Sequence, residues 1–290
     1  MLRPVQSTGY DSKGLRGLLA EAREAGATDL HFKVPGQPRM RVDGDLLTTS
    51  RPALTPKDTQ RLAQTVLELA GREAPLASLT DLTLGFGVHR EGRFRAQIYR
   101  QRGSIGVVIH RMALEPLRLS DLHAPEGTSE RAWGKPGLIL VTGRRERLGV
   151  ISALVDAYNQ GTSGQLLSLE SPLEYLHRDA RAAIAQREVG VDVSSIAEGL
   201  RVALTDDSDA IATTDLPSVE AVELALRIAE AGRPVVAGLA GTPPGNALRH
   251  LVRLFPQHRE REITERLKAV LHRIFWSEGG ALQDGFTGGR

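Results

Sequence analysis

A glycine followed by a cluster of arginines is the first place where the residue types of this chain could do chemistry. The apolar run at residues 138–141 leads to Gly143, and Arg144, Arg145 and Arg147 follow it closely. Guanidinium groups bind phosphate and carboxylate oxygens, and a glycine lets the backbone turn closely around an anion. The pattern admits an anion site in this loop. A solvated surface loop explains the same residues and is the interpretation that we favour.

A strand and a helix are expected on the two sides of these arginines. Residues 138–141 are typical of a buried strand, and a helical pattern with one apolar stripe begins at about Gly149. A strand, a loop and a helix in this order are the context in which a phosphate-binding P-loop operates, with the helix N-terminus aimed at the anion.

The loop lacks the residues with which a P-loop binds nucleotide. A P-loop reads GxxxxGK followed by Ser or Thr, and only Gly143 matches this pattern. Leu148 stands in place of the second glycine, Gly149 in place of the lysine and Val150 in place of the magnesium-binding hydroxyl. The lysine supplies a charge-assisted hydrogen bond of about 1.5–3 kcal/mol, so its loss should weaken nucleotide binding roughly ten- to a hundredfold.

The composition indicates a soluble globular protein with room for two domains. The chain has 290 residues, of which 41% are hydrophobic and 25% charged, and its net charge of +2 argues against a general nucleic-acid binder. It has no cysteine, which excludes disulfides and thiolate metal sites, and its histidines show no metal-ligand spacing. No run of about 18 apolar residues and no signal-peptide core occur, so we expect a cytoplasmic protein without membrane insertion.

Two patterns divide the chain. Residues 1–112 alternate amphipathic helices with strands of period two, which predicts an α+β domain. The segment 113–136 is punctuated by prolines and is expected to be a linker. Residues 137–290 alternate apolar runs with helical stretches, as βα units around a parallel sheet do.

Three local signals add detail to this division. Asp43–Gly44 predicts a two-residue hairpin turn. Pro217 is expected to open a helix, and the charged segment 258–275 is expected to form the final helix.

Colinear sequence blocks resemble those of a known family. The chain is similar to the PilT-type ATPases of type IV pilus retraction, within the wider GspE-like superfamily of type II and type IV secretion ATPases. The blocks are ATDLHFKVPGQPRMRVDGDL at 27–46, GRFRAQIYRQRGSIGVVIHRM at 92–112, GLILVTG at 137–143, LLSLESPLEYLH at 166–177, AQREVGVD at 185–192, IAEGLRVALTDDSDAIATTDLPSVEAVELAL at 196–226 and LRHLVRLFP at 248–256.

The resemblance implies a RecA-like C-terminal domain with a mainly parallel sheet, preceded by a PAS-like domain. It also implies a hexameric ring in which arginines of the N-terminal domain reach the nucleotide phosphates. The arginines at the corresponding positions of this chain are Arg93, Arg95, Arg102 and Arg111. Strand alternation places Arg93 and Arg95 on the face opposite Phe94, where they could equally be ordinary solvated side chains.

The resemblance also locates two carboxylates, both at altered motifs. Glu170 falls in the Asp box, which helps orient water and metal in the family, and it could instead be an exposed or capping carboxylate. Asp215 replaces the Walker B glutamate one methylene short, and a helix cap before Pro217 is the interpretation we favour. Residues 238–241, GLAG, replace the Thr-Leu-His-Thr of the His box, so the sensor histidine is missing.

The P-loop, Asp box, Walker B motif and His box are all altered together. This predicts a catalytically impaired PilT-like pseudo-ATPase, which would be a structural or regulatory component of type IV pilus, motility or secretion machinery. One alternative is an active ATPase with a rebuilt P-loop, in which Arg144 or Arg145 replaces the lysine and Glu170 and Asp215 serve metal and water. Another is a monomeric partner-binding module. Neither metal nor nucleotide is expected except under the first alternative, which needs ATP and magnesium. Expected partners are proteins of the pilus or secretion machine, including an active paralogous ATPase in a shared oligomer, at the inner face of the membrane.

Overall fold

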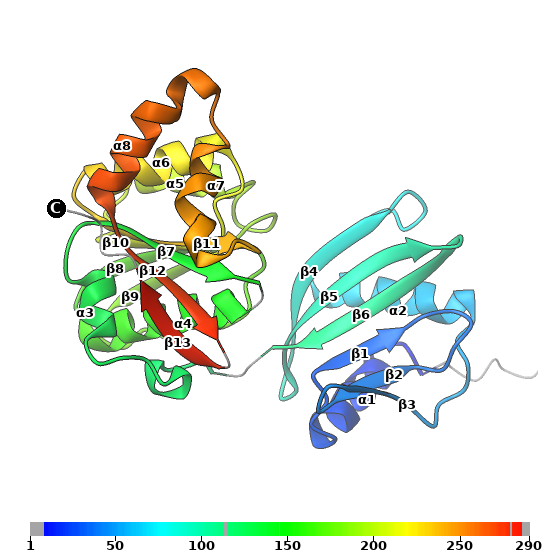
Figure 1. Ribbon diagram of the computed structural model, residues 1–290. Coiled ribbons are helices and arrows are strands. Elements are labelled where there is room, and N and C mark those ends of the chain that lie inside the picture. Colours follow the sequence, from blue (N-terminus) through cyan, green and yellow to red (C-terminus); the bar gives the residue numbers. More distant parts are fainter. Residues whose placement is uncertain (1–8, 113–114, 145, 279, 286–290) are drawn as a thin grey trace, which may run out of the picture. The chain divides into compact units, whose positions relative to one another are not determined.

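The structure is a computed structural model that describes residues 9–112, 115–144, 146–278 and 280–285. The chain divides into two compact units, Met1–Leu114 and Glu115–Arg290 (Figure 1). The described part of the expected linker groups with the second unit, because Leu122 and Ala132 are buried in that unit's core.

The first unit is a six-stranded antiparallel sheet with helices on one face, in the strand order β3-β2-β1-β6-β5-β4. Its elements are α1 Ser12–Glu24, β1 Asp29–Phe32, β2 Arg39–Val42, β3 Asp45–Thr48, α2 Pro56–Leu69, β4 Asp81–Val88, β5 Gly92–Gln101 and β6 Ser104–Arg111. Alternate strand residues pack against α1 and α2, so the expected α+β pattern is observed.

Local signals set the ends of these elements. Thr55 accepts a hydrogen bond from the Asp58 backbone N–H while the Asp58 carboxylate accepts from the Thr55 N–H, which is a capping box at the start of α2. Asp43 and Gly44 both have positive φ and join β2 to β3 in the predicted two-residue turn.

The second unit holds a seven-stranded sheet in the order β13-β12-β7-β11-β10-β8-β9, parallel except for β13. Its strands are β7 Gly137–Gly143, β8 Gln165–Glu170, β9 Ala183–Glu188, β10 Ala210–Thr213, β11 Pro234–Ala240, β12 Leu271–Glu278 and β13 Ala281–Gly285. Its helices are η1 Leu119–Leu122, α3 Thr128–Trp133, α4 Glu146–Gly161, α5 Ile196–Ala203, α6 Val219–Glu230, η2 Pro244–Asn246, α7 Ala247–Val252, η3 Gln257–Arg259 and α8 Glu260–Val270. The α/β class with a mainly parallel sheet is confirmed.

Helices cover both faces of this sheet. Leu138 and Leu140 pack in the core that includes α5 to α8, whereas Ile139 and Val141 pack against α3 and α4. A strand buried on both faces requires apolar residues at every position, which explains the continuous run in β7.

Two predicted helices are present, but their boundaries differ from the prediction. The helix expected at Pro217 begins at Val219. The final charged helix ends at Val270, and the residues that follow form β12, where Phe275 is fully buried. Among the described helices, none combines the length and apolarity that crossing a bilayer requires.

Candidate functional site

Helix α4 begins inside the stretch that would form the curl of a P-loop. The strand ends at Gly143 and the helix begins at Glu146, three positions before the helix start that the sequence pattern indicated. Leu148 and Val150 lie inside α4, where their side chains are 6% and 0% exposed. The positions of the P-loop glycine and hydroxyl are therefore packed into the core.

Arg147 is buried as well, in contrast to the solvated loop that we favoured from the sequence. Its Nε donates to the Thr214 carbonyl oxygen at 3.1 Å and its Nη1 donates to the Arg144 carbonyl oxygen. Burial lowers the pKa of the guanidinium, and the charges of Asp215 and Glu174 raise it in part. Arg147 therefore ties the first turn of α4 to the end of β10.

The structure does not gather the other residues of the candidate anion site, Gly143, Arg144 and Arg145, into a binding site. Arg144 is exposed, and Arg145 lies outside the described residues. Gly143 has positive φ, and its carbonyl oxygen accepts from the Gly241 N–H at 2.8 Å. This hydrogen bond fastens the segment that replaces the His box to the end of β7.

Glu170, at the end of β8, is buried and hydrogen-bonded. Its Oε1 accepts from the Ser168 hydroxyl at 2.8 Å and from Gln186 Nε2 at 2.7 Å, and 7% of the residue is exposed. Burial raises the pKa of its carboxyl from 4.5 to about 7, although both hydrogen bonds act in the opposite direction. Glu170 is neither the exposed nor the capping carboxylate that the sequence also allowed.

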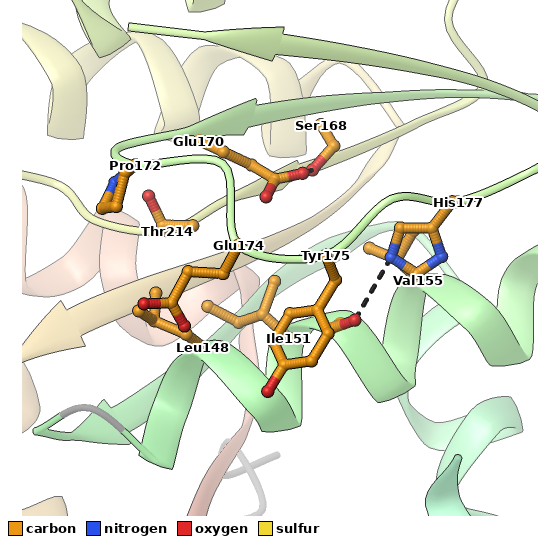
Figure 2. Close-up of a pocket in the computed structure, with 11 residues that line it drawn as sticks. Leu148, Ile151, Val155, Ser168, Glu170, Pro172, Glu174, Tyr175, His177 and Thr214 are labelled. Carbon is orange, nitrogen blue, oxygen red and sulfur yellow. Dashed lines mark hydrogen bonds between the residues drawn. The ribbon is translucent and has the colours of Figure 1, made fainter. Parts of the chain in front are cut away.

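A small cavity lies beside Glu170, between α4 and the segment after β8 (Figure 2). Glu174, His177 and Thr214 also line it, and its volume is about 10 Å³. A cavity of this size holds about one water molecule. It has no room for a phosphate group.

His177 also lines this cavity, although no sequence pattern selects it as a site residue. Its Nε2 lies 3.3 Å from the Ser152 hydroxyl, as the dashed line in Figure 2 marks. Burial lowers the pKa of the imidazole from 6.5 to about 4. The only sequence signal was its place seven residues after Glu170 in the same motif block.

Asp215 does not cap α6, which corrects the interpretation that we favoured. Ser218 is the N-cap and accepts from the Ala221 N–H at 3.2 Å. Asp215 Oδ1 instead accepts from the Leu216 N–H at 3.0 Å and from the Ala240 N–H at 3.3 Å. The carboxylate thus joins the ends of β10 and β11 at the carboxyl edge of the sheet, where α/β proteins place their ligands.

The strand ends around Glu170 and Asp215 are joined to each other. The Ser171 N–H donates to Thr214 Oγ1 at 2.9 Å, which links the ends of β8 and β10. The structure thus brings together Glu170, Thr214 and Arg147 at this edge. No group of three or more metal-ligating side chains occurs within the described ranges.

The four arginines expected at a subunit interface do not form one set within the first unit. The alternation of β5 places Arg93 and Arg95 on the face away from the helices, as predicted. Arg111 pairs in register with the buried Phe94, so it points to the other face, and Arg102 lies in the β5–β6 turn. Arg93 and Arg102 are nine positions apart along β5 and the turn that follows it, which in an extended strand corresponds to about 30 Å.

The chain is similar in sequence to curated proteins of pilus retraction. It is 27% identical to the type IV pilus ATPase PilU of Pseudomonas aeruginosa over 242 residues, which are 83% of this chain and 63% of PilU. It is 28% identical to the retraction ATPase PilT of the same organism, over 89% of this chain and 75% of PilT. An uncharacterized Escherichia coli protein, YggR, is 30% identical over 85% of this chain and 75% of its own length.

Solved structures agree with these relatives. The crystal structure of the pilus retraction motor PilT with bound ADP has a TM-score of 0.79 and 31% identity, over 92% of this chain and 80% of that one. The Legionella pneumophila ATPase DotB has a TM-score of 0.80 at 20% identity, over 94% of this chain and 78% of DotB, and shows the fold alone. A scan against models of protein families finds none that matches.

Proposed function

The chain belongs to the PilT-like family of type IV pilus and secretion ATPases, and from that premise we propose that it is a catalytically impaired member. In this proposal the protein is a pseudo-ATPase. It serves as a structural or regulatory component of type IV pilus, motility or secretion machinery. This role requires the fold of the family but not ATP hydrolysis.

The single observation that carries the proposal is the start of α4 at Glu146. A P-loop binds phosphate because its backbone curls and aims several N–H groups at the anion. Here the backbone is helical where that curl belongs, and Leu148 and Val150 are buried. The side chain of Arg147 is directed to the Thr214 carbonyl oxygen, so it is not free to replace the missing lysine.

The residues present do not fit a magnesium nucleotide in this proposal. Val150 has no ligating atom and is fully buried, and the hydroxyl of Thr214 already accepts from the Ser171 N–H. The Glu170 carboxylate faces a space of about 10 Å³. We therefore derive no step of hydrolysis through a metal or a nucleotide.

Calorimetric titration of the full chain with ATP and magnesium tests this. The expected result is no binding tighter than about 1 mM, because the lysine, the hydroxyl and the curled backbone are all missing. Micromolar, magnesium-dependent binding that an Arg145→Ala variant loses would support a rebuilt loop instead. An Arg16→Ala variant, altered at an exposed position of α1, is the matched control.

One observation favours the second candidate, an active ATPase with a rebuilt P-loop. The pKa of Glu170, raised to about 7, is where a general base works best near neutral pH. Such an enzyme would need α4 to unwind at its first turn before phosphate could enter. The titration above separates the two candidates, since unwinding would appear as magnesium-dependent binding.

The partners follow from the proposed role. They are proteins of a pilus or secretion machine, including an active ATPase of the same family that shares an oligomer with this chain. Light scattering of the pure chain, alone and mixed with such an ATPase, tests this. A clean monomer in both samples would favour the monomeric binding module over any shared ring.

A further inference from the structure

A second and larger cavity lies on the other side of the parallel sheet, away from the site described above. It is formed by η2, α7, α8 and the β12–β13 hairpin, and its volume is about 340 Å³. Pro244, Leu248, Ile274 and Trp276 line it, together with Gly245, Lys268 and Gly285. No acidic side chain is among the described residues that line it. This is the size and the apolar character of a site that takes a small molecule or one bulky side chain.

The cavity is built from fixed parts of the fold. Ile274 belongs to the core under α8 and is 5% exposed, so the floor of the cavity is continuous with that core. Trp276, two residues further along β12, points to the same face by strand alternation and remains half-buried. A large aromatic ring at the wall of an apolar pocket is the side chain most often found at the centre of protein interfaces.

Helix α7 adds positive charge beside the cavity. Leu248 lines the cavity, and the next exposed residues of this helix segment are Arg249, His250 and Arg253. Arg249 and Arg253 are four positions apart and share a helix face, where like charges repel each other. In the part of the chain that the structure describes, neither arginine has a carboxylate partner.

Most arginines of the neighbouring helices have carboxylate partners. Arg227 and Arg266 both pair with Glu223, and Arg259 pairs with Glu223 and Glu262. Lys268, at the cavity wall, lies 3.1 Å from Glu265. Among the described arginines of α6, η3 and α8, Arg261 alone has no such ion pair, whereas Arg249 in α7 and Arg253 at its C-cap both lack one.

We propose that the Trp276 cavity and the basic side chains of α7 together dock an acidic segment of a partner protein, which inserts one large apolar side chain into the cavity. An acidic segment would relieve the repulsion between Arg249 and Arg253, and the apolar anchor would fill a space that no described side chain of this chain occupies. A lipid surface fits less well. Ala247, Leu251 and Val252 bury the apolar face of α7 in the core, so that face cannot enter a bilayer.

The test is fluorescence anisotropy of the full chain with a labelled probe, a short glutamate-rich peptide that carries one central leucine. Replacing the leucine of the probe by serine should weaken binding about tenfold or more, because the cavity then holds no apolar anchor. The double variant Arg249→Glu/Arg253→Glu should weaken it about tenfold at low salt and less at high salt. Arg16→Glu, which reverses one exposed charge on α1, should leave binding unchanged.

A cavity-filling variant gives an independent readout. A Cβ at Gly245 meets nothing within 4 Å, so Gly245→Leu should fold and should abolish the advantage of leucine over serine in the probe. If this variant fails to fold, the double variant Arg249→Glu/Arg253→Glu still tests whether the peptide binds here.

Four outcomes would overturn the proposal. The first is equal affinity for the leucine probe and the serine probe, and the second is unchanged binding in the double variant Arg249→Glu/Arg253→Glu. The third is self-association of the chain that Gly245→Leu removes. The fourth is binding to anionic phospholipid vesicles in the absence of peptide binding.

Discussion

The guanidinium of Arg147 donates through Nε to the carbonyl oxygen of Thr214, 3.1 Å away. Thr214 follows β10, and Arg147 lies in the first turn of α4. This contact connects the helix that should carry the phosphate loop to the strand that should carry the catalytic carboxylate. Arg147 was a candidate anion ligand in the sequence, and in the structure its guanidinium is already hydrogen-bonded to the backbone.

Removing this contact should destabilise the second unit. Arg147→Ala is expected to lower the free energy of unfolding by about 3 kcal/mol, because a buried charge-assisted hydrogen bond and the packing of the side chain are both lost. Arg144→Ala, at the neighbouring exposed position, should change it by less than about 0.5 kcal/mol. Urea unfolding of both variants measures the difference. Equal values would show that Arg147 does not hold α4.

The first position of the His box, Gly238, has no room for a side chain. A Cβ at Gly238 would lie 2.1 Å from the Thr214 carbonyl oxygen, which belongs to the backbone and cannot rotate away. Gly238→Ala should therefore cost about 3 kcal/mol of stability or more. Gly245→Ala, where a Cβ meets nothing within 4 Å, is the matched control and should be nearly neutral. Thermal unfolding distinguishes the two, and a neutral Gly238→Ala would contradict the geometry.

Glu170 should make the fold less stable as pH rises. Its pKa is about 7 in the folded protein against 4.5 when unfolded, so the folded state binds more protons between these values. The stability that Glu170 contributes is present below pH 4.5 and is lost as pH rises toward 7 and above, by roughly 3 kcal/mol. Glu170→Gln should abolish this loss, so the variant should be more stable than the native protein at pH 8. An unchanged pH profile of urea unfolding would contradict the burial of this charge.

His177 should act in the opposite direction over nearly the same range. Its pKa is about 4 in the folded protein against 6.5 when unfolded, so the folded state binds fewer protons between these values and stability rises with pH. The two groups should largely cancel between pH 4.5 and 6.5 in the native protein. In His177→Asn, the free energy of unfolding should fall with rising pH, because only Glu170 then titrates. In Glu170→Gln it should rise with pH, because only His177 then titrates. Two flat single-variant profiles would contradict this assignment.

Asp215 should stabilise the loop after β10 and not the helix start. Asp215→Ala is expected to cost about 1–2 kcal/mol, because the backbone N–H groups of Leu216 and Ala240 lose their acceptor. Asp215→Asn keeps an oxygen at Oδ1 and should retain most of that stability. Ser218→Ala, which removes the true N-cap of α6, should cost about 1 kcal/mol independently. A double-mutant cycle checks that the costs of Asp215→Ala and Ser218→Ala add.

Much of the fold could be predicted from local patterns. The alternation in β4 to β6, the Asp43–Gly44 turn and the apolar run of β7 each carry their own signal. β10 carries no periodic signal of its own because it spans only Ala210–Thr213, too short for a period to appear. β12 was taken for helix because tertiary pairing with β7 decides its conformation, and the charged segment before it continued a helical pattern.

The site was harder to predict, because its chemistry depends on burial. The family resemblance located Glu170 and Asp215, left open whether Glu170 serves water and metal or is an exposed or capping carboxylate, and a helix cap was favoured for Asp215. Gln186 and Ser168, which hold Glu170, lie on β9 and β8, and no spacing rule joins them to it. Arg147 appeared solvated for the same reason: the early start of α4 turns this residue inward, and a loop pattern does not reveal where a helix begins.

The rate of phosphate release from ATP by the purified full chain, with magnesium present, tests the central claim most directly. We expect a rate that equals that of the Glu170→Ala variant and does not change when magnesium is removed, because neither phosphate nor metal has a place to bind. A magnesium-dependent turnover that Glu170→Ala abolishes would contradict the account and establish an active enzyme.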